Sequence, residues 1–119
     1  MSDETNPKSV ATRCLAAWST GDFATTRALL DDGVTFAGPL GATDGADAYI
    51  EGIKGMAKIV ERVDQHTVFG EGEDVCVIYD LITTQPQARV PTAGWYQVRA
   101  GRITSVRAFF DARPLVPSG

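Results

Sequence analysis

One acidic side chain stands out because of its neighbours. Asp80 lies in an apolar run between Ile78 and Ile82. A carboxyl group that loses water in an apolar cavity has a raised pKa, which suits general acid or base catalysis near neutral pH. Tyr96, on a neighbouring predicted strand, could add a hydroxyl donor. The sequence therefore offers Asp80 and Tyr96 as catalytic candidates. The alternative is that Asp80 lies on the exposed side of its strand, hydrogen-bonded and solvated.

Other nucleophilic and metal-binding residue types are few and scattered. The cysteines are Cys14 and Cys76, and His66 is the one histidine. Because the two cysteines lie on separate apolar segments, the sequence favours buried free thiols over a disulfide. Cys14 is expected to be a small residue that lines a cavity. For His66 a surface or core role is favoured over that of a catalytic base, and Asp111 is interpreted as structural. No ligand cluster predicts zinc and no calcium-loop pattern occurs, so we expect no metal and no other cofactor.

Charge and hydropathy argue against two kinds of partner. The chain has 11 basic and 15 acidic residues, a net charge of −4, and no basic cluster of the kind that binds nucleic acid. No apolar run approaches the roughly 20 residues of a membrane-spanning helix. The polar N-terminus lacks the apolar region of a signal peptide. We therefore expect a cytoplasmic protein that binds neither nucleic acid nor a membrane.

The hydrophobic period changes along the chain from helical to extended. Pro7 fits a helix start, and the pair Gly21-Asp22 ends that helix. Glycines around Pro39 break any regular structure. At 119 residues the chain is long enough for one domain, 1–119, with a polar tail over 1–7 and an irregular tail over 113–119. The predicted helices are 7–20, 23–30 and 46–60, and the predicted strands are 34–36, 63–69, 75–84, 92–98 and 103–110.

The segment 95–113 predicts a β-hairpin, because two alternating apolar runs flank the short polar break Arg99-Ala100-Gly101-Arg102. Helices followed by an antiparallel meander are typical of an α+β fold with a curved sheet and helices on one face. Such a sheet tends to leave a cone-shaped, mostly apolar cavity, and cavities of this kind are usual ligand sites. We therefore expect a small hydrophobic ligand or substrate.

Four segments together resemble the nuclear-transport-factor-2-like superfamily, in particular its SnoaL-like branch. They are 18–23 (WSTGDF), 29–36 (LLDDGVTF), Pro39 with Gly45, and 101–111 (GRITSVRAFFD). The resemblance implies a cone-shaped, curved, mixed or antiparallel sheet wrapped around the N-terminal helices, as in the cystatin-like roll. It also implies a homodimer through the open sheet face. The fold carries isomerases, polyketide cyclases, epoxide hydrolases and binding modules, so function has to be argued from the site.

The positions that carry catalytic groups in these relatives hold none here. The tyrosine and two aspartates of the steroid isomerases match Cys14, Gly38 and Gly94, and the catalytic aspartate of the cyclases and epoxide hydrolases matches Ala108. The chain is therefore not predicted to be a standard enzyme of these types. Asp80 is similar to a second aspartate of the epoxide hydrolases, although the arginine two residues before that aspartate is Ile78 here.

Alternation along each strand predicts which side chains face the cavity. A slip of one residue would reverse any set. The resemblance turns Val106, Ala108 and Phe110 inward, and the other inward sets are Thr92, Gly94, Tyr96 and Val98 on one strand and Cys76, Ile78, Asp80 and Ile82 on another. The expected cavity residues are Cys14, Trp18, Phe36, Tyr49, Ile78, Val106, Ala108 and Phe110.

Three functions remain open at this point. The first is an enzyme without cofactor that acts on a small apolar substrate through Asp80 and Tyr96. The second is a binding protein, in which Gly38, Gly94 and Ala108 enlarge the cavity. The third is an association module whose outer sheet face, with Phe109, Trp95 and Val77, forms an apolar patch.

Overall fold

The structure is a computed structural model that describes residues 6–115. Both predicted tails lie partly outside the described residues, at 1–5 and 116–119. Within them, Pro7 already opens the first helix, and Arg113–Leu115 forms a short 3₁₀ helix where an irregular tail was predicted.

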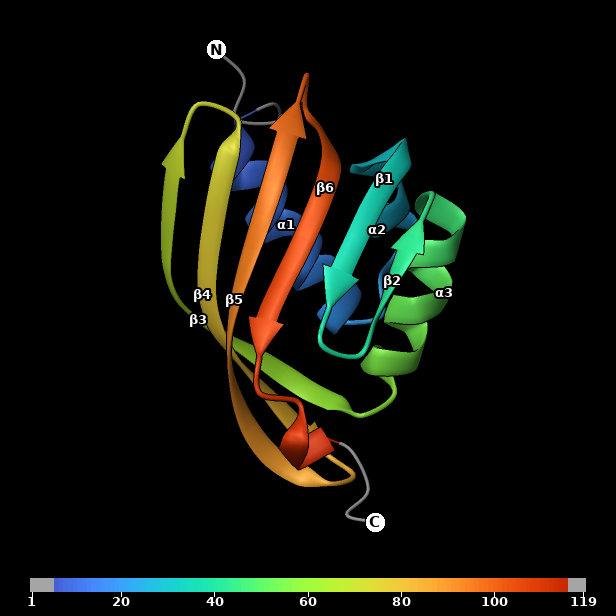
Figure 1. The fold of residues 1–119 in the computed structure, drawn as a ribbon, viewed down its shortest axis with the longest axis vertical. Helices are drawn as coiled ribbons and strands as arrows, with labels where there is room; N and C mark the ends of the chain where they lie inside the picture. Colours follow the sequence, from blue (N-terminus) through green and yellow to red (C-terminus); the bar gives the residue numbers. More distant parts are fainter. Residues whose placement is uncertain (1–5, 116–119) are drawn as a thin grey trace.

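Three helices and six strands form the described chain (Figure 1). Asn6 caps the first helix, because its side-chain oxygen accepts hydrogen bonds from the amides of Lys8 and Ser9. Asp22 caps the second helix in the same way through Thr25. The helices are α1 (Pro7–Ser19), α2 (Phe23–Ala28) and α3 (Ala46–Ala57), and the strands are β1 (Leu30–Gly38), β2 (Gly41–Asp44), β3 (Val60–Glu71), β4 (Asp74–Thr84), β5 (Gln87–Arg99) and β6 (Arg102–Phe110).

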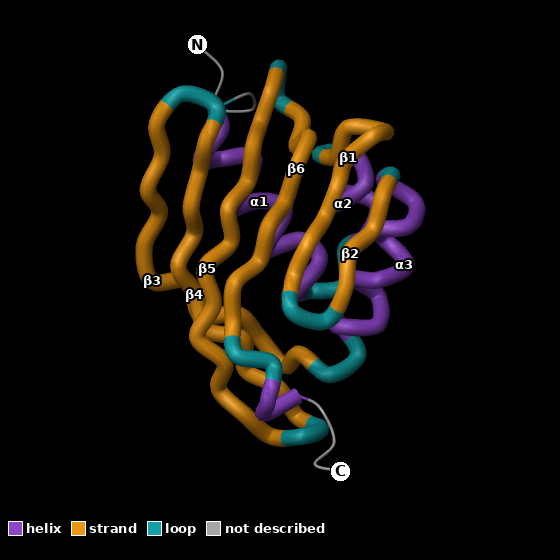
Figure 2. The backbone as a smooth tube through the Cα atoms, viewed as in Figure 1, coloured by secondary structure: helices purple, strands orange, loops and turns teal. Residues whose placement is uncertain are grey.

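All six strands belong to one curved, unclosed sheet in the order β2-β1-β6-β5-β4-β3. Every neighbouring pair is antiparallel except β1 and β6, which run parallel. The helices lie together on one face of the sheet (Figures 1 and 2). α1 packs against β3, β4, β5 and β6, and α3 packs against β1 and β2. The predicted α+β fold with a curved mixed sheet around the helices is confirmed.

The sequence predicted two regions of the sheet incompletely. Leu30 was assigned to a helix but starts β1, and β2 was not predicted, since its first residue, Gly41, was assigned to a loop. β2 has only four residues, and its burial does not alternate, so it carries no period-two signal. The parallel pairing of β1 with β6 joins segments far apart in sequence, such as Phe36 with Val106, and no local pattern predicts such a pair.

The alternation predicted for β5 and β6 is confirmed. Tyr96 and Val98 are each 2% exposed, and Val106 is 3% exposed, so all three face the helices. Phe109, on the other face, is 52% exposed. This face of the sheet, away from the helices, is called the outer face below.

The alternation predicted for β4 is wrong by one residue. The side chains that face the helices are Val75, Val77, Tyr79 and Leu81, all 5% exposed or less. Cys76, Ile78, Asp80 and Ile82 therefore lie on the outer face, and Val77 does not. Both alternating sets of β4 are apolar, so the period of two could not select the inward one.

The hairpin of β5 and β6 turns through a strained alanine. Ala100 has φ +54° and Gly101 has φ +79°, which are the positive values of a type I′ turn. An L-residue other than glycine in this conformation costs about 1–2 kcal/mol, and asparagine tolerates it better than alanine.

Ala100→Asn should therefore raise the free energy of unfolding by about 0.5–1 kcal/mol. Denaturant unfolding of the variant beside the parent protein measures this difference. Ala48→Asn is the matched control, because Ala48 is exposed in the first turn of α3, away from the hairpin, where the same substitution relieves no positive φ. A loss of stability in both variants would contradict the turn geometry.

Candidate functional site

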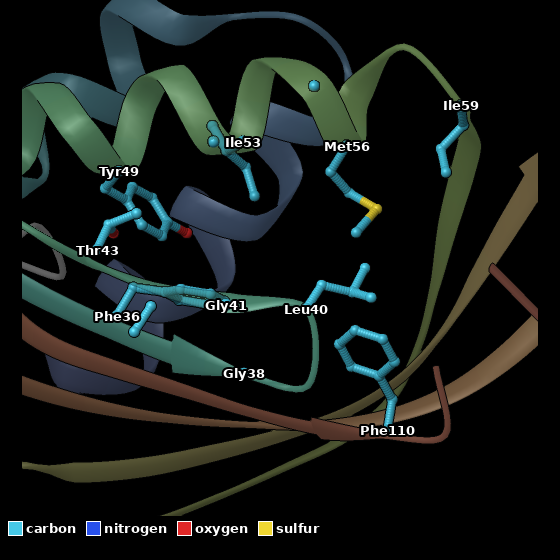
Figure 3. A pocket seen from close by; sticks show the side chains of 13 residues that line it. Phe36, Gly38, Leu40, Gly41, Thr43, Tyr49, Ile53, Met56, Ile59 and Phe110 are labelled. Carbon is cyan, nitrogen blue, oxygen red and sulfur yellow. The ribbon is translucent and has the colours of Figure 1, made fainter. Parts of the chain in front are cut away.

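An apolar pocket of about 410 Å³ opens between α3 and the β1–β2 hairpin. Figure 3 shows Tyr49 at one end of it and Ile59 and Phe110 at the other. The lining residues come from the hairpin, from one face of α3, and from the ends of β6 and the α3–β3 connection: Phe36, Gly38, Leu40, Gly41, Ala42, Thr43, Tyr49, Gly52, Ile53, Gly55, Met56, Ile59 and Phe110.

Helix geometry and small residues together form this pocket. Tyr49, Ile53 and Met56 are spaced by four and three residues, so their side chains share one face of α3. Opposite them, the hairpin turns through Pro39 and Leu40, and Gly41, the first residue of β2, has φ +148°. Gly52 and Gly55 lie on the helix side of the lining and carry no side chain. Space is therefore left beside them, between the helix and the hairpin.

The lining carries no ionisable acid, base or thiol that titrates near neutral pH. Thr43 and Tyr49 are its two polar side chains. The Oγ1 atom of Thr43 is buried without a hydrogen-bond partner. Burial raises the pKa of Tyr49 well above its ordinary value, so its hydroxyl stays protonated at neutral pH. The pocket can therefore bind apolar groups and exchange hydrogen bonds, but it lacks a general base.

The interior below the pocket holds three further groups. Tyr96 faces inward as predicted, and burial raises its pKa well above the ordinary value. Tyr79 lies on the same face, where its ring and that of Tyr96 flank Gly94. Burial raises the pKa of the Cys14 thiol to about 12, so the nucleophilic thiolate is absent at neutral pH. Tyr79 was missed because the predicted register of β4 was wrong.

The predicted pairing of Asp80 with Tyr96 in one cavity is also wrong. Asp80 lies on the outer face, where Arg89 Nη1 is 2.7 Å and His66 Nε2 is 3.0 Å from its Oδ2 atom. Asp64 lies 3.6 Å from the same Arg89 nitrogen. Hydrogen bonds from His66 and then from Arg89 lower the pKa of Asp80, where a raised value was expected. Asp80 is therefore a stable carboxylate in a surface ion-pair network.

The other predicted cavity residues divide into three groups. Phe36, Tyr49 and Phe110 line the pocket. Cys14, Trp18 and Val106 are buried in the core without lining it. Ile78 lies on the outer face with Asp80, and half-buried Ala108 lies beside Gly38.

Helical periodicity in the sequence places Ile53 and Met56 on one side of their helix, so that part of the lining is predictable from the sequence. Leu40, Ala42 and Thr43 were missed. Leu40 lies within the glycine-proline break that was interpreted as a loop, and Ala42 and Thr43 follow it.

Aromatic rings lie against Gly38 and Gly94, the two glycines that match aspartates of the steroid isomerases. A Cβ atom on Gly38 would lie 3.0 Å from Cζ of Phe36, and one on Gly94 would lie 3.0 Å from Cε1 of Tyr96. Gly94 does not line the pocket, so the expectation that it enlarges the cavity is wrong, whereas Gly38 is one of the lining residues.

Asp111, interpreted as structural, forms a local ion pair. It accepts hydrogen bonds from Arg113, which lower its pKa to about 2. Over residues 6–115, no group of three or more histidine, cysteine, aspartate or glutamate side chains is placed to hold a metal ion. No helix in the same range has the length and apolar character to cross a membrane. A cytoplasmic location stays a prediction.

The lowered pKa of Asp80 gives a pH-dependent prediction. Its contribution to stability is fully present above the unfolded value of about 3.9 and is lost as pH falls through the lower folded value. Asp80→Asn should therefore destabilise the protein at pH 7, with a difference that shrinks at acid pH. Unfolding at a series of pH values measures it.

Asp44→Asn is the control, since Asp44 is an exposed carboxylate with no ion pair to another described residue. A difference for Asp80→Asn that is constant from pH 7 to strongly acid solution would contradict the ion-pair network.

Comparison with known proteins agrees with this architecture. The family described as SnoaL-like domain matches residues 11–106. A crystal structure from Kribbella flavida DSM 17836 shares 30% identity over 91% of this chain and 88% of its own, with a TM-score of 0.85. An NTF2-like protein of unknown function from Cytophaga hutchinsonii shares 29% over 97% and 98%, with a TM-score of 0.80.

An LEH-like epoxide hydrolase from M. tuberculosis shares the fold, at 24% identity over 92% of this chain and 86% of its own and a TM-score of 0.79. Among curated proteins none matches the chain. The predicted resemblance to the nuclear-transport-factor-2-like superfamily is confirmed, and the match over residues 11–106 shows that this chain belongs to the SnoaL-like domain family.

Proposed function

We propose that this protein binds a small, mainly apolar molecule in the pocket between α3 and the β1–β2 hairpin, without acid/base catalysis. The observation that carries the proposal is the chemistry of the lining, in which eleven of the thirteen residues carry no polar side-chain group. The pocket volume of about 410 Å³ falls within the range of about 300–1,000 Å³ that is usual for small-molecule sites.

Two features favour binding over catalysis. The family's acid positions hold Gly38, Gly94 and Ala108, and rings fill the space at the two glycines. Asp80, the acid that the sequence offered as a catalytic candidate, points away from the pocket into an ion-pair network. Transfer of apolar surface from water is then the main source of affinity, at roughly 25 cal/mol per Å² before the costs of association.

A pocket-filling variant tests this function. Ile53 projects from α3 into the pocket (Figure 3), and Ile53→Trp should occupy the space of the ligand. Isothermal titration calorimetry with naphthalene, an uncharged apolar probe, should show saturable 1:1 binding to the parent protein. We expect Ile53→Trp to weaken it by about 10-fold or more, which corresponds to about 1.4 kcal/mol.

Ala48→Trp is the matched control, because it adds the same side chain to an exposed position of the same helix that does not line the pocket. It should bind naphthalene like the parent. Equal binding by Ile53→Trp, or no binding by the folded parent protein, would contradict the proposed function.

Assembly as a homodimer through the outer face is a second proposal, supported by a patch of exposed aromatic residues. Phe69 pairs with Cys76 across β3 and β4, and Cys76 pairs with Trp95 across β4 and β5, so these three side chains form a row. Phe109 lies beside them. Phe69 is 60% and Phe109 is 52% exposed, and large exposed apolar side chains gathered on one face are typical of association surfaces.

Phe109→Glu should therefore shift the protein from dimer to monomer, because two buried carboxylates would face each other across a twofold interface. Sedimentation velocity over a range of protein concentrations measures the change. Ala48→Glu, which adds the same charge to an exposed face of α3, should leave the dimer intact. A parent protein that stays monomeric at high concentration would refute this assembly.

A further inference from the structure

The Tyr49 end of the pocket differs from the rest because polar atoms gather there. Thr43 lies opposite Phe36 in the β1–β2 pairing, and the Phe36 and Tyr49 rings are 5.5 Å apart between centroids. Both polar side chains of the lining are therefore close to Phe36. The opposite end, at Ile59 and Phe110, is apolar (Figure 3).

Neither hydroxyl at this end has a partner among the described residues. The Thr43 Oγ1 atom is buried and unpaired. The side chain of Tyr49 is only 3% exposed, and no hydrogen bond joins its hydroxyl to any residue in the range 6–115. Buried polar groups in folded proteins are nearly always hydrogen-bonded, and an unpaired one costs roughly as much as a lost hydrogen bond. The Tyr49 hydroxyl therefore has unused hydrogen-bonding capacity beside an open pocket.

The surroundings of the Tyr49 hydroxyl favour an uncharged hydrogen-bonding partner. No lysine, arginine or histidine lines the pocket to balance an anion, and no aspartate or glutamate lines it to balance a cation. Tyr79, Tyr96 and Cys14, the other polar groups that interact electrostatically with Tyr49, are buried and remain protonated at neutral pH. A charged ligand group would lose its hydration without gaining a counter-ion, which is costly.

We propose that the ligand of this pocket is an uncharged molecule with an apolar body and a hydroxyl or carbonyl oxygen at the end that meets Tyr49. This inference rests on the proposed function and deepens it. The apolar body lies along Ile53, Met56 and Leu40 toward Phe110. The Tyr49 hydroxyl donates to the ligand oxygen, and it also accepts when that oxygen belongs to a hydroxyl group. The contact of Tyr49 with Phe36 holds the ring in place before the ligand arrives.

Three probes that share one ring system separate the contribution of the apolar body from those of a neutral and of a charged oxygen group. Naphthalene carries no oxygen, 2-naphthol carries one neutral hydroxyl, and 2-naphthoate carries a charged carboxylate. Calorimetry on the intact protein should give 2-naphthol an affinity about 3- to 10-fold above that of naphthalene, as one added hydrogen bond provides. 2-Naphthoate should bind more weakly than naphthalene.

Tyr49→Phe tests whether the preference for 2-naphthol over naphthalene depends on the Tyr49 hydroxyl, because it removes that hydroxyl and keeps the ring that contacts Phe36. In this variant 2-naphthol and naphthalene should bind with equal affinity, whatever the affinity for naphthalene itself becomes. A cooperative unfolding transition of the variant shows separately that it is folded.

The outcomes distinguish the two proposals. Equal affinity for naphthalene and 2-naphthol in the parent protein, tighter binding of 2-naphthoate, or a 2-naphthol preference that survives Tyr49→Phe would overturn the oxygen subsite and leave the apolar pocket in place. A folded parent protein that binds none of the three probes would overturn both proposals.

Discussion

The pairing of β4 with β5 places Val77 opposite Gly94 and Tyr79 opposite Thr92. Side chains alternate along a strand, so this one register sets the face of every residue on both strands. It turns Tyr79 and Tyr96 toward the helices, where their rings flank Gly94. It also puts Asp80 on the outer face beside Arg89. The face of the sheet that packs against the helices therefore carries the buried, neutral phenol groups of Tyr79 and Tyr96.

The pocket depends on a different part of the sheet. The parallel pairing of β1 with β6 sets the β1–β2 hairpin at the edge of the sheet, under α3. There the walls carry Gly38, Gly41 and Gly52, and the room between helix and hairpin stays open. The lining that leaves this space open also carries no group that is charged at neutral pH. Both the open volume and the apolar lining, whose polar groups are the two hydroxyls of Thr43 and Tyr49, favour the proposed binding of an apolar molecule.

Sequence patterns predicted the elements whose signals are local. Pro7 marked the start of α1, and glycine in a polar break marked the β5–β6 hairpin at Ala100 and Gly101. The helical spacing of apolar residues in α3 correctly predicted that Tyr49, Ile53 and Met56 share one face. The resemblance to a known family supplied the curved sheet.

The remaining features depend on interactions between distant segments. The inward face of β4 could not be chosen, because Cys76, Ile78 and Ile82 are as apolar as the set that is buried. The charge of Asp80 was the one cue for the outer face, and it was interpreted as a sign of catalysis. The short strand β2 and its Thr43 were missed, since four residues without alternation resemble a loop. A pocket wall built from such a segment is predictable only from the folded chain.

We propose that this protein binds its ligand in the space between α3 and the β1–β2 hairpin. Methyl-resolved NMR, with naphthalene added in steps to the isotope-labelled protein, locates the binding site, because isoleucine methyl groups lie both in the pocket and on the outer face. We expect the shifts to concentrate at Ile53, Met56 and Ile59 and to leave Ile78 and Ile82 unchanged. Shifts that concentrate at Ile78 and Ile82 on the outer face would contradict this proposal.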